Sequence, residues 1–288
     1  MIVEKLAVVG VGLIGGSFAA ALKQAGAVRE VLGVGRNPAS LEAALAGGLI
    51  DRAAGWAEAG QADCILLALP VGETEAVLGQ LAPYLKAGTV VTDAGSTKLN
   101  VVAAARAALG DRFVDFVPGH PIAGSEQCGP GAARADLYRG KRVVLTPQAD
   151  THADAVATVR LLWEAAGAQV ETLDAAQHDR VFAAVSHLPH LAAFALVDEL
   201  AQRADGDTCF RFAASGFRDF TRIAGSSPEM WRDIALANRE ALLAELDAYL
   251  ASLQALRQAV DAGDADALMK TFSRARNARE NWIKTQDS

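Results

Sequence analysis

A glycine pattern after a short apolar run near the N-terminus constrains the fold of this chain more than any other feature. The run at 5–9 has the composition of a buried strand, and a helical pattern follows the glycines. In a βαβ unit such glycines permit a tight turn, let the backbone approach a pyrophosphate, and let the helix pack on the strand. We expect a phosphate at the helix N-terminus. The predicted dinucleotide-binding residues are Gly10, Gly12, Leu13, Ile14 and Gly15.

Strand-like and helix-like runs alternate up to about residue 173. Strands are expected at 5–9, 31–35, 63–69, 89–93, 113–117, 142–146 and 168–173. Helical spacing with a polar face covers 13–25, 73–85, 97–109 and 152–166. This alternation predicts a Rossmann-type α/β domain over 1–173, with a mostly parallel sheet covered by helices.

The strand signals stop beyond Asp174, and alanine and leucine recur at helical spacing instead. Helices are expected at 174–203, 208–223, 228–261 and 264–283. We therefore expect an all-α C-terminal domain over 174–288. A single helix across 228–261 would need neighbours along its whole apolar face, which either the domain core or a second subunit could supply.

Composition narrows the classes of partner. The net charge is −7 with no basic block, so nucleic acid is not an expected partner. Cys64, Cys128 and Cys209 lack metal-ligand spacing, so we expect reduced thiols, no metal and a cytoplasmic protein. The uncharged run 6–22 could be a signal peptide, but glycines interrupt it and it is shorter than the ~20 residues of a membrane span. No membrane partner is expected.

Two loops at the carboxyl ends of predicted strands carry reactive side chains. Ser96 and Lys98 follow the strand 89–93, at the sheet edge where ligands bind in this fold class. Alternatively, Ser96 or Thr97 only caps the next helix. His120 follows the strand 113–117 and precedes a proline, which holds it extended. It is suited to act as a base at neutral pH, although a hydrogen-bonded loop histidine remains an alternative.

The helical half of the chain contributes histidines and arginines. His187 and His190 are three residues apart on one helical face, and Pro189 must interrupt the backbone hydrogen bonds there. A metal pair is disfavoured because no carboxylate or cysteine completes it. Arg218 and Arg222 also share a helical face, and arginine is a bidentate partner for carboxylates. Spacing does not decide which arginine binds a ligand.

Five motifs in this order, GVGLIGGS, DAGSTK, GHPIAGSE, SHLPH and GFRDFTRIA, resemble the prephenate dehydrogenase family. That family includes arogenate and cyclohexadienyl dehydrogenases. The resemblance covers essentially the whole chain, and the histidine loop and FTRIA are more specific than the glycine turn. It implies an NAD(P)-dependent oxidative decarboxylation of prephenate to 4-hydroxyphenylpyruvate, or of arogenate to tyrosine, in tyrosine biosynthesis.

The resemblance also implies roles for individual residues. His120 corresponds to the histidine that accepts the proton of the ring hydroxyl, and Ser96 helps to orient substrate and cofactor. Arg222 corresponds to the arginine that binds a substrate carboxylate, His190 faces the substrate side chain, and His187 joins it as a substrate-binding candidate. The helical domain would form a homodimer. Since the chain ends near residue 288, we expect any inhibition by tyrosine to act at the active site.

The residue after the second strand bears on the cofactor. NAD-binding folds usually carry an acid there, whereas this chain reads Gly35-Arg36-Asn37. Arg36 suits a 2′-phosphate, so NADP is favoured over NAD, unless Arg36 is a solvated loop residue of an NAD enzyme.

Another hydroxy-acid dehydrogenase is an alternative function, but such an enzyme would use a lysine that the helix 174–203 lacks. A non-catalytic dinucleotide sensor is a second alternative. The choice between prephenate and arogenate stays open.

Overall fold

The structure is a computed structural model that describes residues 1–124 and 127–285. Ser125 and Glu126, the last two residues of the GHPIAGSE motif, lie outside the described residues, as do residues 286–288. The chain forms two compact units, Met1–Arg239 and Glu240–Ser288. Both sheets and all the predicted site residues belong to the first unit.

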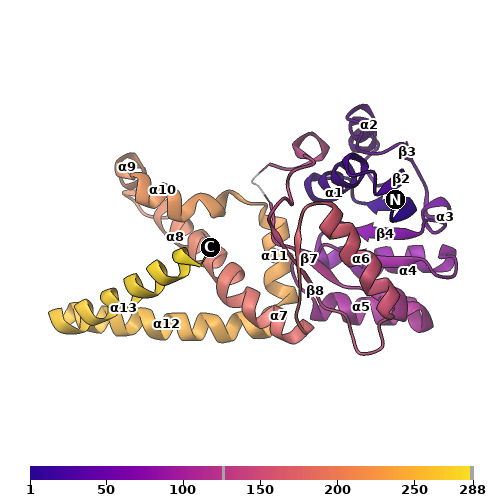
Figure 1. Ribbon diagram of the computed structural model, residues 1–288. Coiled ribbons are helices and arrows are strands. Elements are labelled where there is room, and N and C mark those ends of the chain that lie inside the picture. Colours follow the sequence, from indigo (N-terminus) through magenta and orange to yellow (C-terminus); the bar gives the residue numbers. More distant parts are fainter. Residues whose placement is uncertain (125–126, 286–288) are drawn as a thin grey trace. The chain divides into compact units, whose positions relative to one another are not determined.

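The main sheet has six strands in the order β3-β2-β1-β4-β5-β6, and every described pairing in it is parallel (Figure 1). The chain order reverses between β1 and β4, which is the topological switch point of a Rossmann fold. The predicted fold class is therefore confirmed. The strands are β1 Val3–Val9, β2 Val28–Val34, β3 Arg52–Ala53, β4 Cys64–Leu67, β5 Val90–Asp93 and β6 Phe116–Val117.

Helices cover both faces of this sheet, and each face has its own apolar core. On one face Phe18 packs on Trp163 with ring centroids 4.2 Å apart, and on the other Leu78, Val101 and Phe113 are buried. Predicted helix 73–85 is divided into a short turn, a helix and another turn. The helices are α1 Leu13–Gln24, α2 Pro38–Ala46, α3 Trp56–Ala59, α4 Thr74–Leu81, α5 Leu99–Leu109 and α6 Ala153–Ala165.

A second, three-stranded sheet corrects the prediction of one continuous sheet. β7 Gly119–Pro121 pairs antiparallel with β8 Arg142–Leu145, which pairs parallel with β9 Gln169–Thr172. Residues 110–115 form a 3₁₀ helix, so strand 113–117 shrinks to β6. His120 therefore lies in a strand, opposite Val144, and not in a loop.

The chain then continues as helices, with a π-helical turn at Ala183–His187 just before Pro189. This turn matches the predicted interruption. By length and composition alone, the helical run Ala175–Ala201 could cross a membrane, but a core helix passes the same test. The further helices are α7 Ala175–Phe182, α8 Leu188–Ala201, α9 Gly206–Phe212, α10 Ser215–Thr221, α11 Pro228–Ala237, α12 Arg239–Asp261 and α13 Ala265–Lys284.

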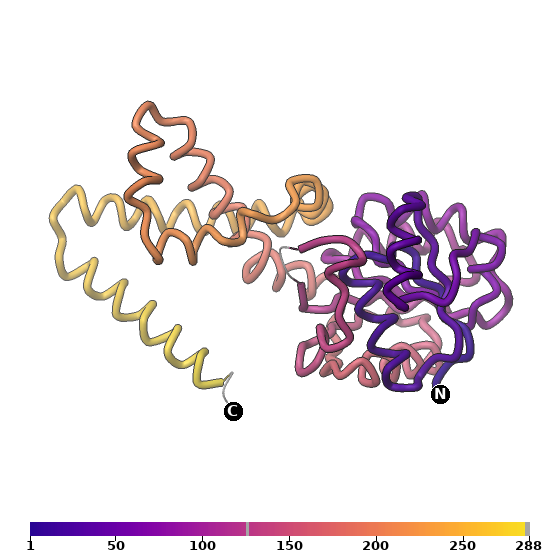
Figure 2. Tube along the Cα trace, turned by 90° about the horizontal axis from the view of Figure 1, so that it is seen from above, coloured from indigo at the N-terminus to yellow at the C-terminus, as the bar shows by residue number. Residues whose placement is uncertain are grey.

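The prediction of one helix across 228–261 was wrong. Asn238 leaves the helical conformation, with φ −106° and ψ 33°, and separates α11 from α12. Its side chain is buried and bonds groups outside both helices, so tertiary contacts override the helical pattern of the flanking residues. In the second unit, α12 and α13 form a helical hairpin, drawn in yellow in Figure 2.

Candidate active site

The turn between β1 and α1 has the geometry that a dinucleotide requires. Gly10 has φ +91°, and a Cβ there would lie 2.3 Å from the carbonyl oxygen of Ala68. A Cβ on Gly15 would lie 2.3 Å from the carbonyl oxygen of Gly10, so the helix packs closely on the turn. Apart from Gly12 itself and its chain neighbours, no described atom lies within 4 Å of the Cβ position of Gly12. Gly12 therefore leaves room for a ligand to approach the backbone.

The N-terminus of α1 is also prepared for an anion. Among the described residues, no side chain caps the helix, and no acidic residue lies in its first turn. Leu13 and Ile14 open this turn, and Tyr138 fixes it by donating its hydroxyl to the carbonyl oxygen of Ile14 at 2.6 Å. The helix dipole favours a phosphate at this position.

Arg36 lies just beyond β2, as the sequence predicts, and its side chain is exposed. Its Nη2 is 2.6 Å from the Glu73 carboxylate, in the 3₁₀ turn after β4. An exposed ion pair of this kind contributes at most ~1 kcal/mol of stability. So weak a pair does not commit the guanidinium of Arg36 to Glu73.

A buried ion pair supports the loop that leads to His120. The Lys98 ammonium, fully buried, donates to the carboxylate of Asp93 and, at 2.6 Å, to the carbonyl oxygen of Gly119. Asp93 also accepts the N–H of Gly119 at 3.0 Å. Lys98 thus connects the end of β5 with the residue before His120, which is a structural role and not a catalytic one.

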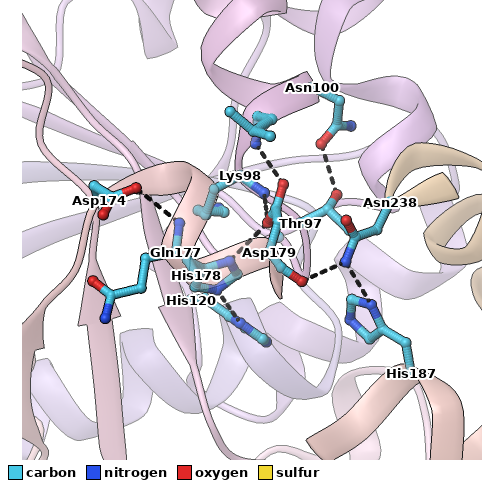
Figure 3. A network of polar contacts seen from close by, with 12 residues as sticks. Thr97, Lys98, Asn100, His120, Asp174, Gln177, His178, Asp179, His187 and Asn238 are labelled. Carbon is cyan, nitrogen blue, oxygen red and sulfur yellow. Dashed lines mark hydrogen bonds and ion pairs between the residues drawn. The ribbon is translucent and has the colours of Figure 1, made fainter. Parts of the chain in front are cut away.

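Asp179, on α7, caps α5 from outside that helix (Figure 3). Its carboxylate accepts the backbone N–H groups of Lys98 at 2.8 Å and Leu99 at 2.9 Å. The alternative that Ser96 or Thr97 caps this helix is therefore wrong: the cap residue is Lys98 by position, and Thr97 donates its hydroxyl to Asn100. Ser96 is half-buried in the loop before α5.

The same carboxylate begins a chain of contacts that ends at His120. Nδ1 of His178 lies 2.8 Å from Oδ1 of Asp179, and Nε2 of His178 lies 2.8 Å from Nδ1 of His120. Because an ionised carboxylate only accepts, His178 carries its proton on Nδ1 and its Nε2 is an acceptor. His120 must then donate from Nδ1, so its Nε2 has a free lone pair. His120 is hydrogen-bonded, and this bond leaves its Nε2 able to accept a proton.

The electrostatics agree with this assignment. Burial alone would raise the pKa of Asp179, but hydrogen bonds from His178, Leu99 and Lys98 outweigh it and lower that pKa. Burial lowers the pKa of His178, against the opposing effect of Asp179. The pKa of His120 falls well below its usual range because of burial and the neighbouring His178 and Lys98. Both imidazoles are therefore neutral at physiological pH.

The predicted histidines 187 and 190 lie in the same region, around Trp231. His190 stacks on Trp231 with ring centroids 3.6 Å apart, and His187 meets its edge at 6.0 Å. The 3₁₀ turn Arg222–Gly225 packs on α8, and the charge of Arg222 contributes to a lowered pKa at His190, behind the effect of burial. The backbone of Ser96 likewise affects the pKa of His187. Four of the five histidines thus gather in one region.

Sequence reasoning missed three residues of this site: His178, Asp179 and Asn238. The adjacent histidine and aspartate at 178–179, at the start of the first predicted helix after residue 173, were the available signal for the first two. Nothing local marks Asn238, whose amide donates to the carbonyl oxygen of Asp179 at 2.8 Å. In the described part of the chain, no cluster of three or more histidine, cysteine or acidic side chains could hold a metal.

Comparison with known proteins identifies the relatives of this site. The family profile for the nucleotide-binding domain of prephenate dehydrogenase matches residues 18–172, and that for its dimerization domain matches residues 174–274. The chain belongs to the prephenate dehydrogenase family. Its relatives point to the oxidative decarboxylation of prephenate in tyrosine biosynthesis, carried out by a nicotinamide-dependent oxidoreductase.

Individual relatives of the family cover most of the chain. Prephenate dehydrogenase from Bacillus subtilis is 36% identical over 284 residues, 96% of this chain and 76% of that protein. Cyclohexadienyl dehydrogenase from Zymomonas mobilis is 38% identical over 76% of this chain and 75% of its own length. The crystal structure of prephenate dehydrogenase from A. aeolicus, in complex with hydroxyphenyl propionate and NAD+, has a TM-score of 0.91 and 36% identity, covering 96% of this chain and 98% of that one.

Proposed function

We propose that this protein oxidises and decarboxylates prephenate, with His120 as the proton acceptor. The observation that carries this assignment is the contact sequence from Asp179 through His178 to His120, which leaves Nε2 of His120 unprotonated. We infer the reaction from the family to which the chain belongs, and the identity of the base from these contacts. Arogenate remains the second candidate substrate, because an arogenate dehydrogenase from Synechocystis is 31% identical with a TM-score of 0.81.

Each residue of the site has its own proposed role in the reaction. Nε2 of His120 accepts the proton of the ring hydroxyl, and the ionised Asp179 stabilises the positive charge that then develops on the two imidazoles. When bound, the nicotinamide supplies the hydride acceptor. Loss of the ring carboxylate as carbon dioxide makes the ring aromatic. Ser96 orients the hydroxyl and the cofactor, and Arg222, on a turn that packs on the helix of His190, binds a substrate carboxylate.

The proposed cofactor is NADP in preference to NAD. Arg36 follows β2 where NAD-binding folds usually carry an acid, and its exposed guanidinium is available to a 2′-phosphate. The dinucleotide would lie on the N-terminus of α1, with Gly12 facing its pyrophosphate. NAD remains the second candidate, since the A. aeolicus relative was crystallised with NAD+.

We also propose that the protein is a cytoplasmic homodimer, assembled through its helical residues. Large apolar side chains are exposed on α12 and α13, among them Leu250, Phe272 and Trp282. The match to a dimerization domain over residues 174–274 covers most of these helices.

Turnover with prephenate and each cofactor, followed by the appearance of reduced nicotinamide, tests this function directly. His120→Asn should retain dinucleotide binding and lower kcat about 10²–10⁴-fold, the usual range for loss of a general base. His152→Asn, at the histidine outside the site, is the matched control and should leave kcat unchanged. No turnover by the wild-type protein, or near-normal turnover by His120→Asn, would contradict the proposal.

A further inference from the structure

A segment with a single charged side chain packs on the first turns of α1. Residues 129–135 read Gly-Pro-Gly-Ala-Ala-Arg-Ala, so Arg134 is the only charged residue among them. The 3₁₀ turn Pro130–Ala132 of this segment packs on α1 and on α2, the helix that begins just after Arg36 (Figure 1). Segment 129–138 therefore borders the two parts of the nucleotide-binding domain that the proposed function assigns to the dinucleotide.

Two hydrogen bonds fix segment 129–138 on α1. The backbone N–H of Arg134 donates to Oγ of Ser17 at 3.0 Å. The Tyr138 hydroxyl, fully buried, donates to the carbonyl oxygen of Ile14 at 2.6 Å. The segment is thus held against the helix by its own contacts, and such preorganisation lowers the entropic cost of using a side chain on it to bind a ligand.

The turn that would bind the pyrophosphate has no cation of its own. Residues 10–16 carry no charged side chain. The helix dipole and the backbone N–H groups at the N-terminus of α1 are equivalent to only about half a positive charge, whereas a pyrophosphate is a dianion. A guanidinium from another segment would therefore strengthen binding, and it can bridge phosphate oxygens with two hydrogen bonds.

Arg134 is within reach of this position. Ser17, its backbone partner, comes four residues after Leu13, the first residue of α1, which corresponds to about 6 Å along the helix axis. An extended arginine side chain covers a separation of that size. The Arg134 side chain is 61% exposed, and its only ion pair with the described residues joins Nε to Asp136 at 3.5 Å. Because both partners are exposed, this pair is weak and would give way to a phosphate.

We propose that Arg134 binds the pyrophosphate of the dinucleotide at the N-terminus of α1. This inference rests on the proposed function for the presence of a dinucleotide, but not for the identity of the substrate. Arg134 and Arg36 would then have different roles, because the pyrophosphate is common to NAD and NADP, whereas the 2′-phosphate belongs to NADP alone. The two arginines are therefore distinguished by the cofactors whose binding they affect.

Fluorescence titrations of Arg134→Gln with NADP, NAD and ADP-ribose test this role. All three dissociation constants should rise by a similar factor, about 5- to 20-fold, because all three ligands carry the pyrophosphate. Adenosine 2′-monophosphate, which lacks a pyrophosphate, should bind the variant and the wild type equally. Added salt should weaken NAD binding less in Arg134→Gln than in the wild type, since salt screens the charge that the variant lacks. Arg134→Lys, which keeps the charge, should recover part of the affinity.

Two further variants serve as controls. Arg142→Gln removes a comparably exposed arginine on β8, whose partner is Glu171 on β9, and should change each dissociation constant less than about 2-fold. Asp136→Asn removes the carboxylate beside Arg134 and should not weaken binding. Unchanged affinities in Arg134→Gln, or a loss confined to NADP, would overturn the assignment.

Failure of the proposed function would be visible separately. Wild-type protein that binds a dinucleotide but does not turn over prephenate would contradict the proposed function, and the titrations of Arg134→Gln would still decide the role of Arg134. Wild-type protein that binds no dinucleotide would overturn both.

Discussion

Nε2 of His178 lies 2.8 Å from Nδ1 of His120, and this contact determines which nitrogen of His120 can take a proton. An isolated imidazole exchanges between two tautomers, only one of which presents the lone pair of Nε2 to a substrate. His178, itself fixed by Asp179, removes the unproductive tautomer. Two residues on α7 thus hold the proposed base in one tautomer.

Asp179 therefore has a testable effect on chemistry. Asp179→Asn should lower kcat about 10²-fold or more, within the range for loss of base function, while KM and dinucleotide affinity change little. Asp174→Asn is the matched control, because the Asp174 carboxylate caps the same helix, α7, by accepting the backbone N–H of Gln177, and Asp174 contacts His178 only through its backbone carbonyl. Steady-state kinetics and cofactor titrations check both. Equal losses in the two variants would point to a purely structural role.

Arg222 and Arg218 should differ as ligands for the substrate. Arg222→Ala should raise KM for prephenate about 10- to 100-fold, because the substrate carboxylate would lose a charge-assisted hydrogen bond of ~1.5–3 kcal/mol. Arg218→Ala, on exposed α10, should have a smaller effect. Initial rates over a range of prephenate concentrations measure both. A larger effect at Arg218 would transfer the carboxylate site to that residue.

Local patterns were enough to predict the parallel Rossmann sheet, but not that β7, β8 and β9 form a sheet of their own. The glycine turn, the strands of the Rossmann sheet and the order of His120, His190 and Arg222 depend on neighbours in sequence. Which side chains meet in the site depends on contacts between residues far apart in the sequence, and local sequence patterns do not predict such contacts. Asp179 binds the backbone of Lys98 from 81 residues away, and His178 reaches His120 across 58 residues.

The break at Asn238 shows the same limit. Residues on both sides of it have helical spacing, so periodicity predicts one helix. The break depends on the bonds of Asn238 to Asp179 and His187, which lie 59 and 51 residues away. Tertiary hydrogen bonds of a buried amide thus outweigh the propensity of its neighbours.

Arg36 should discriminate between the two dinucleotides. Arg36→Ala should weaken NADP binding about 10- to 100-fold, since a charge-assisted bond to phosphate contributes ~1.5–3 kcal/mol, and should leave NAD affinity nearly unchanged. Glu73→Gln removes the partner of Arg36 but keeps the guanidinium, so it should change NADP affinity less than about 5-fold. Fluorescence titrations of both variants with NADP and with NAD give four dissociation constants to compare with those of the wild type. Equal losses of NADP and NAD in Arg36→Ala would refute this role.

The histidine cluster should make the fold sensitive to acid. In the unfolded chain His187 takes up a proton near its usual pKa of 6.5, whereas the folded state lowers that pKa to about 4. Between these values the unfolded state binds more protons, so the free energy of unfolding falls as pH falls, by about 2 kcal/mol at pH 5 from His187 alone. The pKa values of His120, His178 and His190 are shifted in the same direction.

Urea unfolding between pH 7.5 and pH 5 measures this dependence. His187→Gln should reduce the slope of unfolding free energy against pH, whatever it does to the stability at pH 7.5. His152→Gln, at the histidine outside the cluster, should keep the wild-type slope. A slope that is the same in His187→Gln and the wild type would show that His187 is not held neutral by the fold.

The helical residues should carry a two-fold interface. On α13 the side chains of Phe272 and Trp282 are 58% and 60% exposed, and on α12 Leu250 is 51% exposed. Apolar groups of this size are rarely left in water over a whole hairpin, and an obligate dimer interface of over ~2,000 Å² would cover them. Light scattering at low micromolar concentration should therefore give twice the chain mass of 30.0 kDa.

Two variants locate the interface. Phe272→Asp should weaken the dimer, whereas Leu45→Asp, a comparable change at an exposed position on α2, should leave it intact. A fully active monomer would contradict the assembly. Dissociation by Leu45→Asp instead of Phe272→Asp would place the interface on the nucleotide-binding domain.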